Sequence, residues 1–104
     1  MLLRSIISKQ KQSEYQKIGI VIVSVPYRQP GNVIEHIPIS FEVYQDGSLF
    51  KANAIVSEEK ARLINLPAYI QFKVKGGKTY CKNAKYKFVA FDIFKELQRN
   101  HLIL

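Results

Sequence analysis

The sequence has few of the residues that form disulfide bonds or bind metal ions in small proteins. It contains one cysteine, two histidines and no tryptophan among 104 residues. One cysteine cannot form an internal disulfide bond, and one cysteine with two histidines cannot supply the four nitrogen and sulfur ligands of a structural zinc site. A disulfide scaffold and structural zinc are therefore excluded, and we expect no cofactor and no metal ligands.

Long hydrophobic runs are also missing. The longest apolar stretch, residues 18–25, contains Gly19 and Ser24 and ends at Pro26. A membrane-spanning helix needs about 20 apolar residues, and a secretory signal needs about 7 to 15 followed by a small-residue cleavage site. We therefore predict a cytoplasmic protein with no membrane span, in which Cys81 stays reduced.

Glycine and proline are scarce and scattered, at 5 and 4 residues, and no linker or repeat is visible. With 47% hydrophobic residues the chain differs from the composition of disordered proteins. Its length fits one domain. We predict a single domain over residues 17–104, preceded by an arm over residues 1–16 that is either mobile or a docking segment.

The first half of that domain has the pattern of three strands. Residues 17–25 are rich in Ile and Val at both odd and even positions, which predicts a strand that is covered on both faces or strongly coiled. Residues 26–31 are expected to break this strand. Residues 37–44 alternate between apolar and polar side chains, as a half-buried strand does. Asp46-Gly47 favours a tight turn, so residues 49–56 are expected to return as the partner strand.

Helix and strand signals alternate in the second half. Ser57 can cap a short helix that runs to about Leu66, before Pro67. Alternation predicts a fourth strand over residues 70–75 and a fifth over residues 85–90. Asp92 can cap a last helix whose apolar stripe comprises Ile93, Phe94, Leu97 and Leu104.

This order of elements predicts a mainly β fold of the α+β type. Three strands, a short helix, two strands and a C-terminal helix resemble the OB-fold, a five-stranded antiparallel Greek-key barrel with a helix between strands three and four. The resemblance is one of element order and length. It implies that the face of strands two and three binds oligonucleotides or oligosaccharides. A strongly bent, open antiparallel sheet with helices on one face is the alternative.

Charge of one sign dominates the chain, with 16 Lys and Arg against 8 Asp and Glu, a net charge of +8. Residues 68–91 contain no acidic residue and six lysines, which are Lys73, Lys75, Lys78, Lys82, Lys85 and Lys87. If the fourth and fifth strands pair, four of these ammonium groups crowd on one face, and like charges across a sheet are destabilising. A bound polyanion would relieve that repulsion. The alternative is a solvated edge strand on which lysines prevent aggregation.

Tyrosines lie among these lysines. Single-stranded nucleic acids are bound by cationic grooves whose aromatic rings stack on bases. Tyr80 is the candidate ring in the lysine-rich segment, and Tyr44 is a second candidate, with Lys51 on the neighbouring strand. A separate group of aromatic residues falls on the apolar parity of the strands and is expected in the core: Phe41, Phe72, Tyr86 and Phe88.

No pattern indicates catalysis. Cys81 has no histidine near it in sequence, and Glu35 and His36 point to opposite faces of an extended segment. We therefore expect a non-enzymatic accessory protein that binds single-stranded DNA or RNA through the six lysines, Lys51 and the two tyrosines. The alternative is a structural or adaptor domain of a larger, for example viral, assembly. A homodimer would form through the N-terminal arm or the C-terminal helix.

Overall fold

The computed structural model describes residues 14–103, which form one antiparallel sheet with three helical segments. Each strand pairs with its neighbour in sequence, in the order β1-β2-β3-β4-β5. The strands are β1 (Gln16–Arg28), β2 (Ile34–Asp46), β3 (Leu49–Ala54), β4 (Tyr69–Lys75) and β5 (Lys78–Tyr80). Helix α2 (Glu58–Leu63) lies between β3 and β4, and the 3-10 helix η1 (Ala84–Tyr86) and helix α3 (Lys87–Arg99) follow β5. The predicted mainly β fold with its two helix positions is confirmed.

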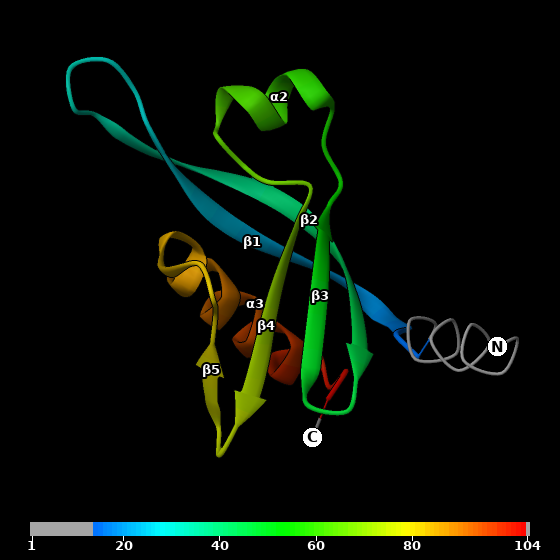
Figure 1. Cartoon of the computed structure of the whole chain (residues 1–104). Helices are drawn as coiled ribbons and strands as arrows, with labels where there is room; N and C mark the ends of the chain where they lie inside the picture. Colours follow the sequence, from blue (N-terminus) through cyan, green and yellow to red (C-terminus); the bar gives the residue numbers. More distant parts are fainter. Residues whose placement is uncertain (1–13, 104) are drawn as a thin grey trace, which may run out of the picture.

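The sheet curls around α3 as half of a barrel (Figure 1). Helix α3 contacts β1 at one end of the strand order and β4 and β5 at the other. The sheet is the bent, open form of the two arrangements expected from the sequence. Its strand order is a meander rather than the Greek key of the OB-fold, because β3 pairs with β4 and the two end strands pair with one neighbour each.

Local sequence signals explain the turns and the first helix. Gly47 adopts a φ of 60° in the Asp46-Gly47 turn that joins β2 to β3, as predicted for this hairpin. The Ser57 side chain accepts a hydrogen bond from the Lys60 amide at 3.1 Å, which caps α2. Gly76 and Gly77 adopt φ values of 60° and 75° and reverse the chain between β4 and β5.

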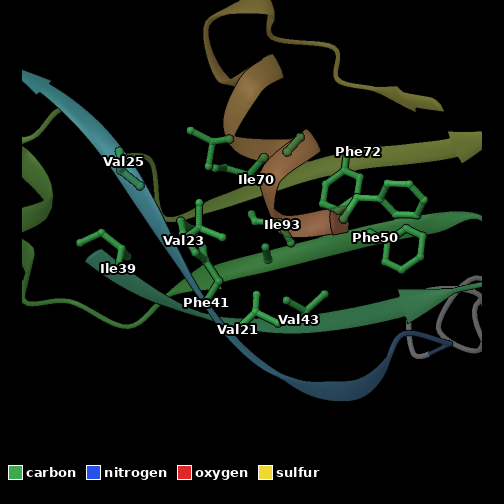
Figure 2. Close-up of a cluster of buried hydrophobic side chains, with 14 of the residues drawn as sticks. Val21, Val23, Val25, Ile39, Phe41, Val43, Phe50, Ile70, Phe72 and Ile93 are labelled. Carbon is green, nitrogen blue, oxygen red and sulfur yellow. The ribbon is translucent and has the colours of Figure 1, made fainter. Parts of the chain in front are cut away.

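The core lies between the concave face of the sheet and α3 (Figure 2). Alternate residues of β1 and β2 point into it, among them Val21, Val23 and the fully buried Phe41. The rings of Phe50 and Phe72 stack with centroids 5.2 Å apart. Helix α3 covers this layer with Val89, Ala90, Ile93, Phe94 and Leu97. Phe41 and Phe72 are buried as predicted.

The prediction for the first strand is partly wrong. β1 does not end at Pro26 but continues to Arg28, and the turn lies at Pro30, Gly31 and Asn32. It is also not covered on both faces. The odd-numbered valines are buried, whereas Ile20 and Ile22 are 50% and 60% exposed, because α3 covers only the concave face. The β1–β2 hairpin extends beyond β3, which pairs only with residues 41–46 of β2 (Figure 1).

The predicted fifth strand over residues 85–90 is wrong. Those residues form η1 and the start of α3, and the fifth strand is the shorter β5. The Asn83 side chain accepts a hydrogen bond from the Lys85 amide at 3.1 Å and starts the helical segment. From there burial follows the helical period, so α3 begins five residues before the predicted cap at Asp92. Leu104 and most of the predicted N-terminal arm lie outside the described residues.

Candidate functional site

The six lysines of residues 68–91 lie on β4, on β5 and on the segment that follows β5, and only three of them are on strands. Lys73 and Lys75 are on β4, and Lys78 is on β5. Lys82 precedes η1, Lys85 is within it, and Lys87 is the first residue of α3. All six side chains are exposed. The expected crowding of Lys85 and Lys87 against Lys73 and Lys75 on one sheet face is wrong, because the first two are helical.

A cleft of about 690 Å³ opens between β5 and the first two turns of α3. We call it the β5–α3 cleft. It is lined by Gly77, Lys78, Thr79, Tyr80, Cys81, Ala84, Lys87, Phe88 and Phe91. Its three aromatic rings are unusually accessible, since Tyr80 is 53%, Phe91 42% and Phe88 77% exposed. The cleft therefore offers flat apolar surfaces to a ligand, with one lysine on each wall.

The phase of α3 places two of those rings in the cleft. Residues three and four apart on a helix are neighbours on one face. Phe91 follows Phe88 by three positions and Lys87 by four, so the three side chains share a face. The buried residues of α3 start at Val89 and Ala90 and use the other face. Phe88 and Phe91 are thus excluded from the core by the helical period.

The electrostatic surroundings of the cleft are positive. Within residues 14–103 the two ion pairs are Lys17 with Glu42 and Arg99 with Glu96, so neither engages a lysine of residues 68–91. The Lys95 ammonium lies 5.6 Å from the centre of the Phe91 ring. Helix α3 also begins at the cleft, and a helix N-terminus has a partial positive charge. The charged residues that line the cleft are both lysines, Lys78 and Lys87, and the acidic Asp92 follows Phe91 on α3.

The positive surface continues from the cleft onto the convex face of the sheet. Across β4 and β5, Lys73 lies opposite Tyr80 and Lys75 lies opposite Lys78. Opposite residues of an antiparallel pair project to the same face. Tyr80 therefore stands between the lysines of the convex face and the rings of the cleft. This placement unites five of the predicted residues around one edge of the sheet: Lys73, Lys75, Lys78, Tyr80 and Lys87.

Tyr44 and Lys51 lie elsewhere on the convex face, opposite each other on β2 and β3. The Tyr44 hydroxyl donates a hydrogen bond of 2.6 Å to Glu42, whose carboxylate also pairs with Lys17 at 2.9 Å. The hydrogen bond from Tyr44, followed by that from Lys17, lowers the pKa of Glu42, and the same hydrogen bond raises the pKa of Tyr44. Lys51 lies 4.4 Å from the centre of the Tyr69 ring. The structure does not bring these two predicted residues to the cleft.

The sequence reasoning missed Phe88 and Phe91. Phe88 was assigned to the core by a strand period, and this assignment is wrong, because it is the most exposed of the large hydrophobic residues described. A helical reading of residues 87–99 would have found both rings, since they fall outside the stripe of Val89, Ile93 and Leu97. Tyr86 is half-buried, and its hydroxyl donates to the Asn65 carbonyl at 3.1 Å.

The other sequence candidates acquire no partners for chemistry. The Cys81 thiol is half-buried and donates to the Gln71 carbonyl at 3.5 Å. Glu35 and His36 are exposed on the β1–β2 hairpin. Within residues 14–103 no three His, Cys, Asp or Glu side chains are grouped as metal ligands.

Comparison with known proteins identifies no relative. The chain matches no family model, no curated protein and no solved structure. Among the helices of residues 14–103, none is both long enough and apolar enough to cross a membrane.

Proposed function

We propose that this protein binds single-stranded nucleic acid in the β5–α3 cleft, without catalysis. One observation carries the proposal: three exposed aromatic rings and two lysines line one cleft, within a segment that has six lysines and no acidic residue. Aromatic platforms beside a cationic track are the means by which proteins bind single strands with little sequence preference.

The rings account for a preference for single strands. Tyr80, Phe88 and Phe91 stack on unpaired bases, each worth roughly 1–3 kcal/mol. In a duplex the faces of the bases are covered by their neighbours, so the rings gain no such contact. The volume of the cleft, about 690 Å³, falls within the roughly 300–1,000 Å³ of small-ligand pockets. It therefore suits the base and sugar of a nucleotide rather than a folded domain.

The lysines account for binding of the backbone. Lys78 and Lys87 line the cleft beside the rings, and the other four lysines lie on β4, on η1 and in the loop before η1. A strand that leaves the cleft in either direction passes exposed ammonium groups. With about five phosphates contacted on a single strand, log K falls with log salt at a slope of about −3.5.

Fluorescence anisotropy tests the proposal with labelled oligo(dT), oligo(rU) and duplex DNA at two salt concentrations. We expect both single strands to bind more tightly than the duplex and to weaken steeply with salt. Equal binding of duplex and single strands would remove the stacking role of the rings. No binding at low salt would reject the proposal and favour the structural or adaptor alternative.

A further inference from the structure

The edge of β1 that faces away from β2 lacks charged side chains over most of its length. β1 stands at one end of the strand order, and within residues 14–103 its strand partner is β2 alone. Residues 18–27 contain no charged side chain. On their convex side Ile20 and Ile22 are 50% and 60% exposed. A long apolar edge strand presents unpaired backbone groups and is a template for pairing with another chain.

The usual protections of an edge strand are confined to the two ends of this one. A bulge lies between Lys17 and Gly19, and Pro26 removes one backbone donor. Between them, residues 20–25 have no lysine, no proline and no bulge. Six consecutive residues are enough to pair with a strand of ordinary length.

A groove of about 460 Å³ runs beside this edge, between β1 and the polar side of α3. It is lined by Ile22, Val23, Ser24, Asp92, Lys95, Glu96 and Arg99. Leu102, which follows α3, packs on Gly19 near the start of β1, since a Cβ at Gly19 would lie 2.7 Å from Leu102 Cδ1. Helix α3 therefore runs antiparallel to β1. The charged side chains of the groove alternate in sign along α3, in the order Asp92, Lys95, Glu96 and Arg99.

We propose that a second copy of this chain occupies the groove, with the two β1 strands paired antiparallel about a two-fold axis. Opposite residues of an antiparallel pair share a face, so even-numbered residues meet even-numbered residues of the other copy. Ile20 and Ile22 of both copies then form one apolar cluster on the convex face. The odd-numbered valines stay buried in the core of their own copy, and the backbone edge of each β1 lies beside the groove of the other.

The charges of the groove complement themselves under the same symmetry. A two-fold axis across β1 reverses the direction of α3, which places the Asp92 end of one helix level with the Arg99 end of the other. Asp92 of each copy then faces Arg99 of the other copy, whose guanidinium also pairs with Glu96 of its own helix at 3.2 Å. Burial, with a smaller effect of Glu96, raises the pKa of Asp92, so this carboxylate would gain from a nearby guanidinium. The dimer interface and the β5–α3 cleft lie at opposite ends of the strand order, so the dimer does not depend on the proposed function.

Light scattering and analytical sedimentation of the full chain over a range of concentrations test the dimer. We expect a mass twice that of the monomer at high concentration, and the monomer mass for Ile22→Lys at every concentration tested. Ile55→Lys is the matched control, because Ile55 is 52% exposed and follows β3; it should dimerise like the parent chain. Circular dichroism confirms that both variants fold.

Charge exchange in the groove gives a second readout. Asp92→Arg and Arg99→Asp should each raise the dissociation constant, and the double variant should restore it, as expected for two residues that face each other across the axis. A chain that remains monomeric throughout would overturn the proposal, as would a dimer that survives Ile22→Lys. Loss of the dimer on removal of residues 1–12, with Ile22→Lys still dimeric, would assign the contact to the N-terminal arm instead.

Discussion

The two edge strands of this sheet differ in length, charge and surroundings. β1 has thirteen residues, and its uncharged stretch lies beside a groove of mixed charge. β5 has three residues, two of them Lys78 and Tyr80, and borders a cleft whose charged lining residues are lysines. An edge protected only at its ends suits pairing with another strand, whereas a short cationic edge beside exposed rings suits a polyanion. The two proposed interaction surfaces therefore lie at the two edges of one sheet, on either side of α3.

Reversal of charge at the β5 edge should have the largest effect. Lys78→Glu with Lys87→Glu is expected to abolish detectable binding of oligo(dT) at moderate salt, because both walls of the cleft then repel phosphate. Any binding that remains at low salt should have a slope of log K against log salt that is shallower by about 1.4, at about 0.7 for each phosphate that is no longer neutralised. Anisotropy titration measures both quantities.

The control for this reversal is Lys60→Glu with Arg62→Glu on α2, which changes the net charge equally. This variant should keep most of the affinity. Equal losses in the two variants would mean that net charge alone, and not the cleft, determines binding.

A change at the β1 edge should instead affect folding. Gly19 adopts a φ of 152°, and the added Cβ of Gly19→Ala would meet Leu102 at 2.7 Å. Backbone strain of this kind costs about 1–3 kcal/mol, and each kcal/mol lowers the Tm of a domain of this size by about 4–8 °C. Thermal unfolding measures the loss, while the affinity of the folded protein for oligo(dT) should be unchanged. An unaltered Tm would show that Leu102 does not seat on β1 as described.

Removal of one ring should have a smaller effect on binding than charge reversal. Phe88→Ala is expected to weaken oligo(dT) binding by about 1–3 kcal/mol, because one stacking platform is removed. The Tm should stay the same, because this side chain is 77% exposed. Tyr69→Ala removes another exposed ring, 46% exposed on the convex face, and should leave the affinity unchanged. The stacking role fails if both variants bind as the parent chain does.

The smallest effect concerns the convex face beside β1. Hydrogen bonds from Tyr44 and Lys17 lower the pKa of Glu42 below its ordinary value of 4.5. A carboxyl group with a lowered pKa contributes stability above its unfolded pKa and loses it as the pH falls through the folded pKa. Glu42→Gln should therefore be slightly less stable than the parent chain at neutral pH, and the gap should close in acid. Urea unfolding of both chains at neutral and at acidic pH tests this prediction. A difference in unfolding free energy that widens in acid would contradict it.

The predictions from sequence succeeded where a signal was local. The Asp46-Gly47 turn, the Ser57 cap and the fourth strand each depend on a few adjacent residues with one dominant conformational preference. The prediction of residues 85–90 failed because apolar residues at 86, 88 and 90 fit a strand period over a short window. The helical period becomes visible only when Ile93, Phe94 and Leu97 are included.

The candidate site was predictable in its charge and not in its shape. The six lysines are visible in the sequence because the segment lacks acidic residues. Their grouping with Phe88 and Phe91 depends on the helical phase of α3 and on the packing of that helix beside β5, which joins residues of different elements. The ion pair between Lys17 and Glu42 likewise depends on the register of β1 against β2.

Nuclear magnetic resonance would show, residue by residue, whether the β5–α3 cleft binds single-stranded nucleic acid. Oligo(dT) would be titrated into the ¹⁵N-labelled full chain while each backbone amide is followed. We predict that the largest shifts fall within residues 77–91 and that β1 residues 18–27 stay unchanged. Largest shifts on β1, or no shifts at low salt, would contradict the assignment of the cleft as the binding site.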